Sequence, residues 1–135
     1  MRYLVDANIL SEPTKKLPNA AVVEWLRDNE GEIAVDPIIL GELRFSVLLL
    51  RNRRRRASLE RWFDAGVQSL RCLPWEAETG LRWAQLLTSL RIAGRAMPIK
   101  DSLTAATALV HGLTVVTRNR VDFEKAGLSI IDPFG

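Results

Sequence analysis

The stretch Arg2-Tyr3-Leu4-Val5-Asp6 is a short apolar run of strand type that ends in a carboxylate. Further short runs of this kind recur along the chain, and longer segments with helical periodicity separate them. We expect strands at residues 2–6, 32–35, 68–73, 114–117 and 128–131. We expect helices at residues 20–29, 37–50, 58–65, 76–91 and 102–111. This alternation predicts an α/β fold, a three-layer α/β/α arrangement around a central, mainly parallel five-stranded sheet.

Length and composition are those of a small globular protein. We expect the 135 residues to form a single domain, and 47% hydrophobic and 26% charged residues are ordinary values for a soluble protein. Asp6 interrupts any signal-peptide core, and no apolar run approaches the roughly 20 residues of a membrane span. Cys72 is the one cysteine, which fits a reducing cytoplasm, and its apolar neighbours predict a buried structural thiol.

The residue inventory excludes several kinds of chemistry. His111 is the single histidine, so one chain cannot supply a two-histidine acid/base pair, and zinc sites of the Cys/His type are excluded by number. Gly112 directly after His111 is a helix stop signal. If the protein is an enzyme, carboxylates must carry its chemistry.

Four carboxylates lie within or beside segments that should be buried: Asp6, Glu42, Asp101 and Asp122. Taken singly, three have ordinary explanations, because Asp6 can end a strand, Asp101 can cap a helix that begins at Ser102, and Asp122 can lie on a surface loop. Burying charge is costly unless the charge is paired or binds a metal. Since ligands of parallel sheets bind beyond the carboxyl ends of the strands, we expect Asp6 and Asp122 at one edge.

Glu42 is the least ordinary of the four. Helical spacing places it on the ridge Ile38, Glu42, Phe45, Leu49, which we interpret as an apolar ridge. A functional site and a structural ion pair, with Arg44 or Arg118, are the competing explanations.

The ordered set of these residues and their flanks resembles the PIN-domain superfamily, and within it the VapC-type toxins of bacterial toxin–antitoxin pairs, including the FitB-like branch. The resemblance covers essentially the whole chain. Its matching segments are residues 3–13 (Tyr-Leu-Val-Asp-Ala-Asn-Ile-Leu-Ser-Glu-Pro), 40–44 (Leu-Gly-Glu-Leu-Arg), 101–108 (Asp-Ser-Leu-Thr-Ala-Ala-Thr-Ala), 116–123 (Val-Thr-Arg-Asn-Arg-Val-Asp-Phe) and 132–134 (Asp-Pro-Phe).

The resemblance implies a single PIN-like domain and a site for Mg²⁺ or Mn²⁺ held by the family's acidic quartet, which falls on Asp6, Glu42, Asp101 and Asp122. Asn8, Asn119 and Thr117 are expected to support these carboxylates. Lys100, Arg118 and Arg120 are predicted contacts to substrate phosphates.

The resemblance also implies an activity and partners. It implies a metal-dependent endoribonuclease that cuts structured RNA, commonly a transfer or ribosomal RNA, a homodimer, and a small DNA-binding antitoxin that blocks the site.

Two departures from the family pattern bear on metal affinity. Ala7 replaces the usual threonine, and Asp36 stands where a serine-rich turn is usual, either as a helix N-cap or as a fifth carboxylate.

Two rival functions remain open at this stage. A phosphatase or phosphotransferase with a nucleophilic aspartate would want a second aspartate beside Asp6, which Ala7 and Asn8 do not supply. A catalytically silent PIN-fold module that binds protein or nucleic acid is the other alternative, and the intact quartet argues against it.

A basic run provides a last observation. Residues 51–56 read Arg-Asn-Arg-Arg-Arg-Arg, in a chain of net charge +3. The run either binds phosphates or forms a solvated bridge between two helices, and the sequence favours the two interpretations equally.

Overall fold

A computed structural model describes residues 1–135. Its five strands form one sheet in the order β3-β2-β1-β4-β5, and every neighbouring pair is parallel. The strands are β1 (Tyr3–Val5), β2 (Ile33–Val35), β3 (Arg71–Cys72), β4 (Thr114–Val116) and β5 (Ile130–Ile131). The predicted α/β fold with a parallel five-stranded sheet is confirmed.

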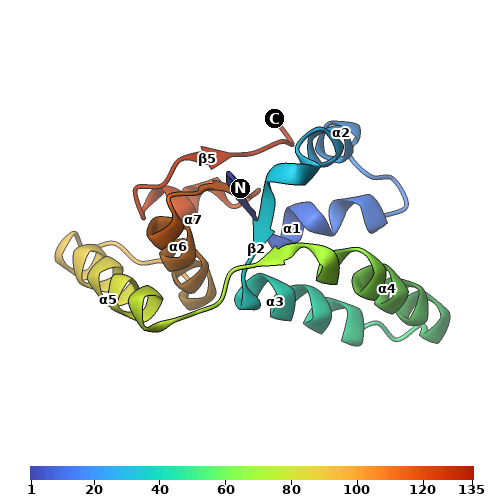
Figure 1. Cartoon of the computed structure of the whole chain (residues 1–135), viewed down its shortest axis with the longest axis horizontal. Helices are drawn as coiled ribbons and strands as arrows, with labels where there is room; N and C mark the ends of the chain where they lie inside the picture. Colours follow the sequence, from blue (N-terminus) through green and yellow to red (C-terminus); the bar gives the residue numbers. More distant parts are fainter.

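Seven helices cover the sheet in two layers. They are α1 (Ala7–Leu10), α2 (Ala20–Asp28), α3 (Pro37–Leu48), α4 (Arg53–Ala65), α5 (Ala77–Ile92), α6 (Ile99–His111) and α7 (Arg120–Glu124). Helices α1 to α4 gather on one side of the sheet, and α5, α6 and α7 gather on the other (Figure 1). The chain runs from β1 through β2 to β3 at one edge of the sheet and then returns to β4 on the other side of β1. Because all crossover connections have the same handedness, this change of direction places the two groups of helices on opposite faces of the sheet. No helix combines the length and the apolar content that spanning a membrane requires.

The reversal of strand order lies between β1 and β4. Tyr3 pairs with Thr114, and Val5 pairs with Val116. The backbone N–H of Asp6 then donates to the carbonyl of Val116 at 2.8 Å, which extends the pairing past the end of β1. Residues that directly follow these two strands therefore meet at a topological switch point, where open α/β sheets bind their ligands.

Two helices begin earlier than their sequence patterns predict. Helix α4 starts at Arg53 because the Asn52 side chain caps it by accepting from the backbone N–H of Arg55 at 3.0 Å. Helix α6 starts at Ile99 after Pro98, so Asp101 lies inside its first turn. The interpretation of Asp101 as an N-cap is therefore wrong, and its carboxylate is free for other contacts. The Gly112 stop signal is confirmed, with φ of 64° after His111.

The short helices α1 and α7 were not predicted, and both follow strands at the switch point. With 4 and 5 residues they are too short for a helical period to be recognised. The predicted strand at 68–73 is confined to Arg71 and Cys72, paired only with β2 at the sheet edge. Cys72 is consequently exposed, and the prediction of a buried thiol is wrong.

The apolar ridge of Glu42 also differs from the expectation. The buried face of α3 consists of Ile39, Leu43 and Val47. Phe45 and Leu49, which we placed on a buried ridge, are each 63% exposed. Glu42 thus lies between the core face of α3 and an exposed apolar stripe.

Candidate active site

Asp6 is the centre of the site, and the end of β1 fixes it. Its side chain caps α1, because Oδ1 accepts from the backbone N–H of Ala7 at 2.8 Å. Its Oδ2 accepts from the Thr117 hydroxyl at 2.8 Å and from the Asn8 amide at 3.4 Å. Asp6 is only 6% exposed. Ala7 has no hydroxyl group to offer the site. Thr117, on the other side of the switch point, supplies a hydroxyl to Asp6.

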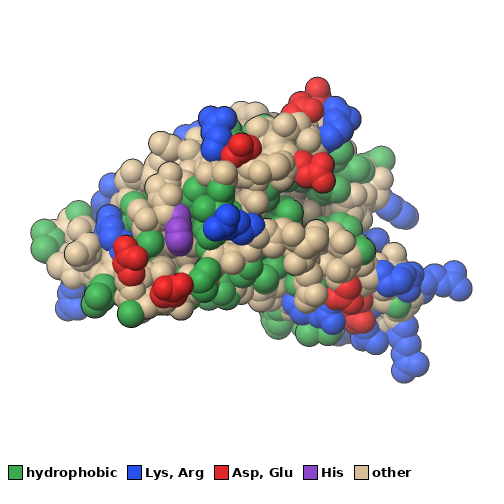
Figure 2. Space-filling model, viewed as in Figure 1, with side chains coloured by type: hydrophobic (Ala, Val, Ile, Leu, Met, Phe, Trp, Pro, Cys, Tyr) green, Lys and Arg blue, Asp and Glu red, His purple; other side chains and the backbone are tan.

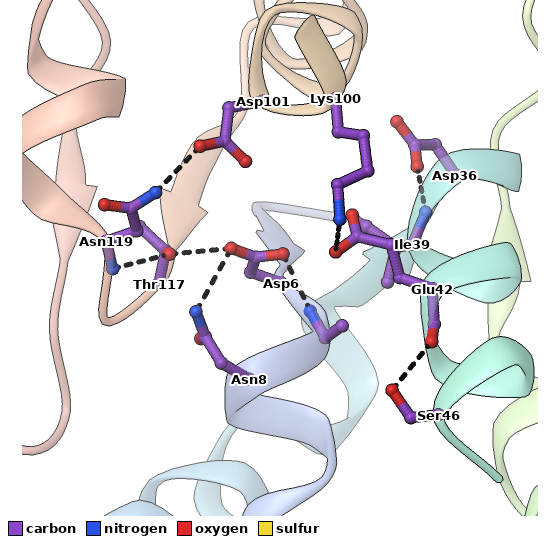
Figure 3. A network of polar contacts seen from close by, with 11 residues as sticks. Asp6, Asn8, Asp36, Ile39, Glu42, Ser46, Lys100, Asp101, Thr117 and Asn119 are labelled. Carbon is purple, nitrogen blue, oxygen red and sulfur yellow. Dashed lines mark hydrogen bonds and ion pairs between the residues drawn. The ribbon is translucent and has the colours of Figure 1, made fainter. Parts of the chain in front are cut away.

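A chain of hydrogen bonds links Asp6 to Asp101 (Figure 3). The buried hydroxyl of Thr117 donates to Asp6 and accepts from the backbone N–H of Asn119 at 2.9 Å. The Asn119 amide then donates to Asp101 Oδ2 at 2.7 Å. Three elements, the end of β1, the segment after β4 and the first turn of α6, are thereby held in one arrangement. The predicted supporting residues Thr117 and Asn119 lie where they orient carboxylates.

Asn8 ties the same region together from the other side. Its amide donates to Asp6, and its Oδ1 accepts from the backbone N–H of Arg118 at 3.2 Å. The α1 helix is thus fastened to the loop after β4, so the orientation of Asp6 depends on both.

Glu42 and Lys100 form an ion pair beside the carboxylates. The Lys100 ammonium lies 3.5 Å from Glu42 Oε2, and both side chains remain partly exposed. The predicted structural partners of Glu42 are engaged elsewhere, because Arg44 pairs with Asp64 at 3.4 Å and Arg118 stacks on the Phe134 ring at 4.1 Å. The structural ion pair with Arg44 or Arg118 is therefore not formed.

Asp122 lies on α7 and contacts none of the other three carboxylates, but its charge raises the pKa of Asp101. Its Oδ1 pairs with the Lys125 ammonium at 3.2 Å, and Lys125 also donates to the Ala96 carbonyl at 2.8 Å. Lys125 was not predicted as a site residue from the sequence. The spacing of three residues from Asp122 would have pointed to it, had α7 been recognised as a helix.

Asp36 follows β2 and is fully buried. Its Oδ1 accepts from the backbone N–H of Ile39 at 2.8 Å, so the predicted N-cap of α3 is confirmed, with Pro37 in the first helical position. Its Oδ2 lies buried beside the Thr107 hydroxyl, which opposes the rise in pKa that burial gives Asp36, and neither atom has another hydrogen-bond partner.

The carboxylates share one electrostatic neighbourhood. Burial is the main cause that raises the pKa of Asp6 and of Glu42, and the charge of Asp6 raises the pKa of Glu42 further. Burial, followed by the charges of Asp6, Asp122 and Glu42, raises the pKa of Asp101 to about 6. Lys100 opposes these shifts at all three groups. Such mutual destabilisation of ionised groups is typical of a functional site.

The donor set fits a hydrated, hard divalent cation. Carboxylate and amide oxygens are the ligands such ions prefer, and the raised pKa values mark negative charge that a cation would neutralise. No group of three or more Asp, Glu, His or Cys side chains is close enough to hold one ion jointly. Mg²⁺ usually keeps several waters and is bound through one or two carboxylates, so wider spacing suits it better than a closed cage.

A cleft of about 420 Å³ opens beside these groups, and Asn8, Glu42 and Lys100 line it. Arg118 is exposed at the site and stacks on Phe134. The Arg120 guanidinium contacts Glu124 at 3.0 Å and the Ile130 carbonyl at 3.2 Å.

Comparison with known proteins identifies the family of the chain. The PIN domain model matches residues 3–128, and the chain belongs to the PIN-domain family. VapC ribonuclease Y4jK of Sinorhizobium fredii is 31% identical over 97% of this chain and 96% of its own. Toxin FitB of Neisseria gonorrhoeae is 32% identical over 97% of both chains. The crystal structure of FitAcB from Neisseria gonorrhoeae superposes with a TM-score of 0.92 at 31% identity and covers 98% of both chains.

Proposed function

We propose that this protein is a metal-dependent endoribonuclease in which one or two carboxylates of the set Asp6, Glu42, Asp101 and Asp122 bind Mg²⁺ or Mn²⁺ directly and the others act through metal-bound water. The observation that carries the proposal is the burial of these carboxylates together with their shared charge, which raise the pKa of Asp101 to about 6 at the switch point of the sheet. The naming of a relative as a ribonuclease supports RNA as the substrate.

A bound Mg²⁺ or Mn²⁺ would supply charge neutralisation, an activated water and stabilisation of the leaving oxygen of a phosphodiester. The chain's own residues set the geometry for this chemistry. Thr117 and Asn119 hold Asp6 and Asp101 in fixed orientations through hydrogen bonds of 2.7 to 2.9 Å. Lys100 lies beside Glu42, where its ammonium can bind a phosphate of the substrate.

We propose structured RNA, a transfer or ribosomal RNA, as the substrate class. We further propose that the protein is a homodimer and that a small DNA-binding antitoxin covers its active site. The name of FitB supports a toxin. The exposed apolar side chains of Phe45, Leu48 and Leu49 on α3, of which Phe45 lines the cleft, supply a surface that such a protein partner can cover.

Cleavage of total cellular RNA by antitoxin-free protein tests the enzymatic proposal. We expect discrete fragments with Mg²⁺ or Mn²⁺, none with EDTA, and none from the Asp6→Asn variant with either metal. Absence of cleavage by folded, metal-loaded protein would refute the nuclease proposal and favour a silent binding module.

A further inference from the structure

The Arg51–Arg56 run lies between α3 and α4, and its arginines divide into two kinds. Arg55 donates to the Thr14 carbonyl at 3.2 Å, and Arg56 donates to the Leu50 carbonyl at 3.5 Å and lies 3.8 Å from Glu60. Arg51, Arg53 and Arg54 are exposed and make no ion pair or side-chain hydrogen bond. Lys and Arg side chains project from the end of the molecule that α3 and α4 form (Figure 2).

Two of these arginines lie where their charge is unfavourable for the stability of α4. Arg53 and Arg54 lie in the first turn, which contains no acidic residue. The partial positive charge at a helix N-terminus disfavours cationic side chains there. Helix stability therefore does not explain the unpartnered arginines, and a local cost of this kind is typical of residues that serve binding.

Two adjoining cavities lie between this end of the molecule and the carboxylates. The cleft beside Asn8 and Glu42 shares Ser11, Leu43 and Ser46 with a second cavity of about 130 Å³. That second cavity continues to Thr14 and Leu50. These are the two residues whose carbonyls hold Arg55 and Arg56, so the two adjoining cavities extend from beside the acidic site to the base of the arginine run.

We propose that Arg51, Arg53 and Arg54 form a phosphate-binding surface, the arginine end, that holds the RNA substrate outside the catalytic cleft. The inference rests on the proposed ribonuclease function and adds a binding surface to it. Arginine recognises backbone phosphates through charge and paired N–H groups, without regard to base sequence. RNA is favoured over operator DNA because the adjoining cavities extend from this surface toward the carboxylates.

The distance between the two regions sets the length of RNA that can use both. The part of α3 from Glu42 to its C-cap Leu49 is about 10 Å long at 1.5 Å per residue. A stacked strand covers this distance with about three nucleotides at 3.4 Å each. An RNA that occupies the cleft and the arginine end therefore needs several nucleotides on one side of the cleaved bond, whereas a dinucleotide occupies the cleft alone.

The test compares Arg53→Gln/Arg54→Gln with the matched control Arg91→Gln/Arg95→Gln. The control removes the same charge from exposed arginines without side-chain partners at the end of α5. On a structured RNA of transfer-RNA size, the first variant should raise KM at least tenfold with kcat unchanged, and the control should match the parent. Cleavage of a dinucleotide should be the same for all three proteins.

Binding of the same RNA to metal-free protein in EDTA gives an independent readout. The slope of log Kd against log salt should decrease by about 1.4 to 1.8 in the first variant, since each lost phosphate contact contributes about 0.7 to 0.9. If the parent cleaves no RNA, the nuclease proposal fails, and this slope still decides the role of the arginine end.

Three results would overturn the inference. The first is unchanged RNA binding and KM in Arg53→Gln/Arg54→Gln, including the case in which only operator-DNA binding is lost. The second is an equal loss in the control. The third is a clear decrease in Tm of the first variant, because removing charges that oppose the α4 dipole should leave Tm equal or higher.

Discussion

Asp6 receives three hydrogen bonds and still has a raised pKa, because its burial outweighs the contacts that favour its charge. We predict that Asp6→Asn lowers RNA cleavage at least a hundredfold and leaves Tm equal or a few degrees higher. The reason is that asparagine remains a good helix cap while the repulsion among carboxylates decreases. Cleavage assays beside thermal melting in EDTA measure both effects. A large decrease in Tm would show that Asp6 is chiefly structural.

Thr117 is a positioning residue, because its hydroxyl joins Asp6 to the backbone of Asn119 inside the protein. Thr117→Val keeps the shape but leaves the buried partners of the hydroxyl unsatisfied, which should cost about 1–3 kcal/mol of unfolding free energy. We expect kcat to decrease about tenfold with KM unchanged. Thr117→Ser restores the hydroxyl and should restore kcat. A valine variant with unchanged kcat would remove Thr117 from the site.

At the scale of secondary-structure elements, Asp36 determines where α3 begins and so where Glu42 lies. Asp36→Ser retains a capping oxygen, and we expect it to stay within about 1 kcal/mol of the parent and to cleave RNA within about threefold of it. Asp36→Ala removes the cap and should lose about 0.5–2 kcal/mol in denaturant unfolding. If the serine variant loses cleavage but keeps its stability, Asp36 acts as a fifth carboxylate of the site.

The sequence was most informative for elements in which an apolar period repeats over several turns, or in which a strong capping residue marks an end. The order of strands and long helices, the Asp36 cap and the Gly112 stop follow from local patterns, and the structure confirms them. The early start of α6 could not be predicted, because Pro98 and the segment after it offer no capping side chain. The pairing of Asn119 with Asp101 depends on that start and on the crossover to β4, which are properties of the whole fold.

The exposed ridge on α3 shows a second limit of sequence reasoning. Ile38, Phe45 and Leu49 share a helical face with Glu42, and an apolar face usually indicates the core. The core face of α3 is the neighbouring one, formed by Ile39, Leu43 and Val47. With apolar residues around most of the helix, periodicity alone cannot tell which face packs inward.

At the scale of the whole molecule, the clustered carboxylates make stability depend on pH. Folded Asp101 binds its proton up to about pH 6, whereas an aspartate in the unfolded chain loses it near 3.8. Between these values the folded chain binds more protons than the unfolded chain does. The free energy of unfolding therefore decreases as pH rises through this range, and it stays constant at higher pH. The raised pKa values of Asp6, Asp36 and Glu42 act in the same direction.

We therefore predict a higher Tm at pH 5 than at pH 7.5 for the protein in EDTA. The lowered pKa values of Glu12 and Glu32 oppose this only below their ordinary value of 4.5, outside the chosen range. Asp101→Asn should reduce the difference between the two Tm values. An equal or higher Tm at pH 7.5 would contradict the raised pKa values of these carboxyl groups.

The contact between Thr117 and Asp6 spans 111 residues of the chain. A ribosome adds about 5–20 residues per second, so the end of β1 waits on the order of 10 s before its partner from β4 is synthesised. Until then, neither Asn119 nor Asp122 exists to complete the acidic site. Any activity of this site therefore begins only when nearly the entire chain has been made. A nascent chain that ends before Thr117 therefore has an incomplete acidic site, and so has a product of early termination.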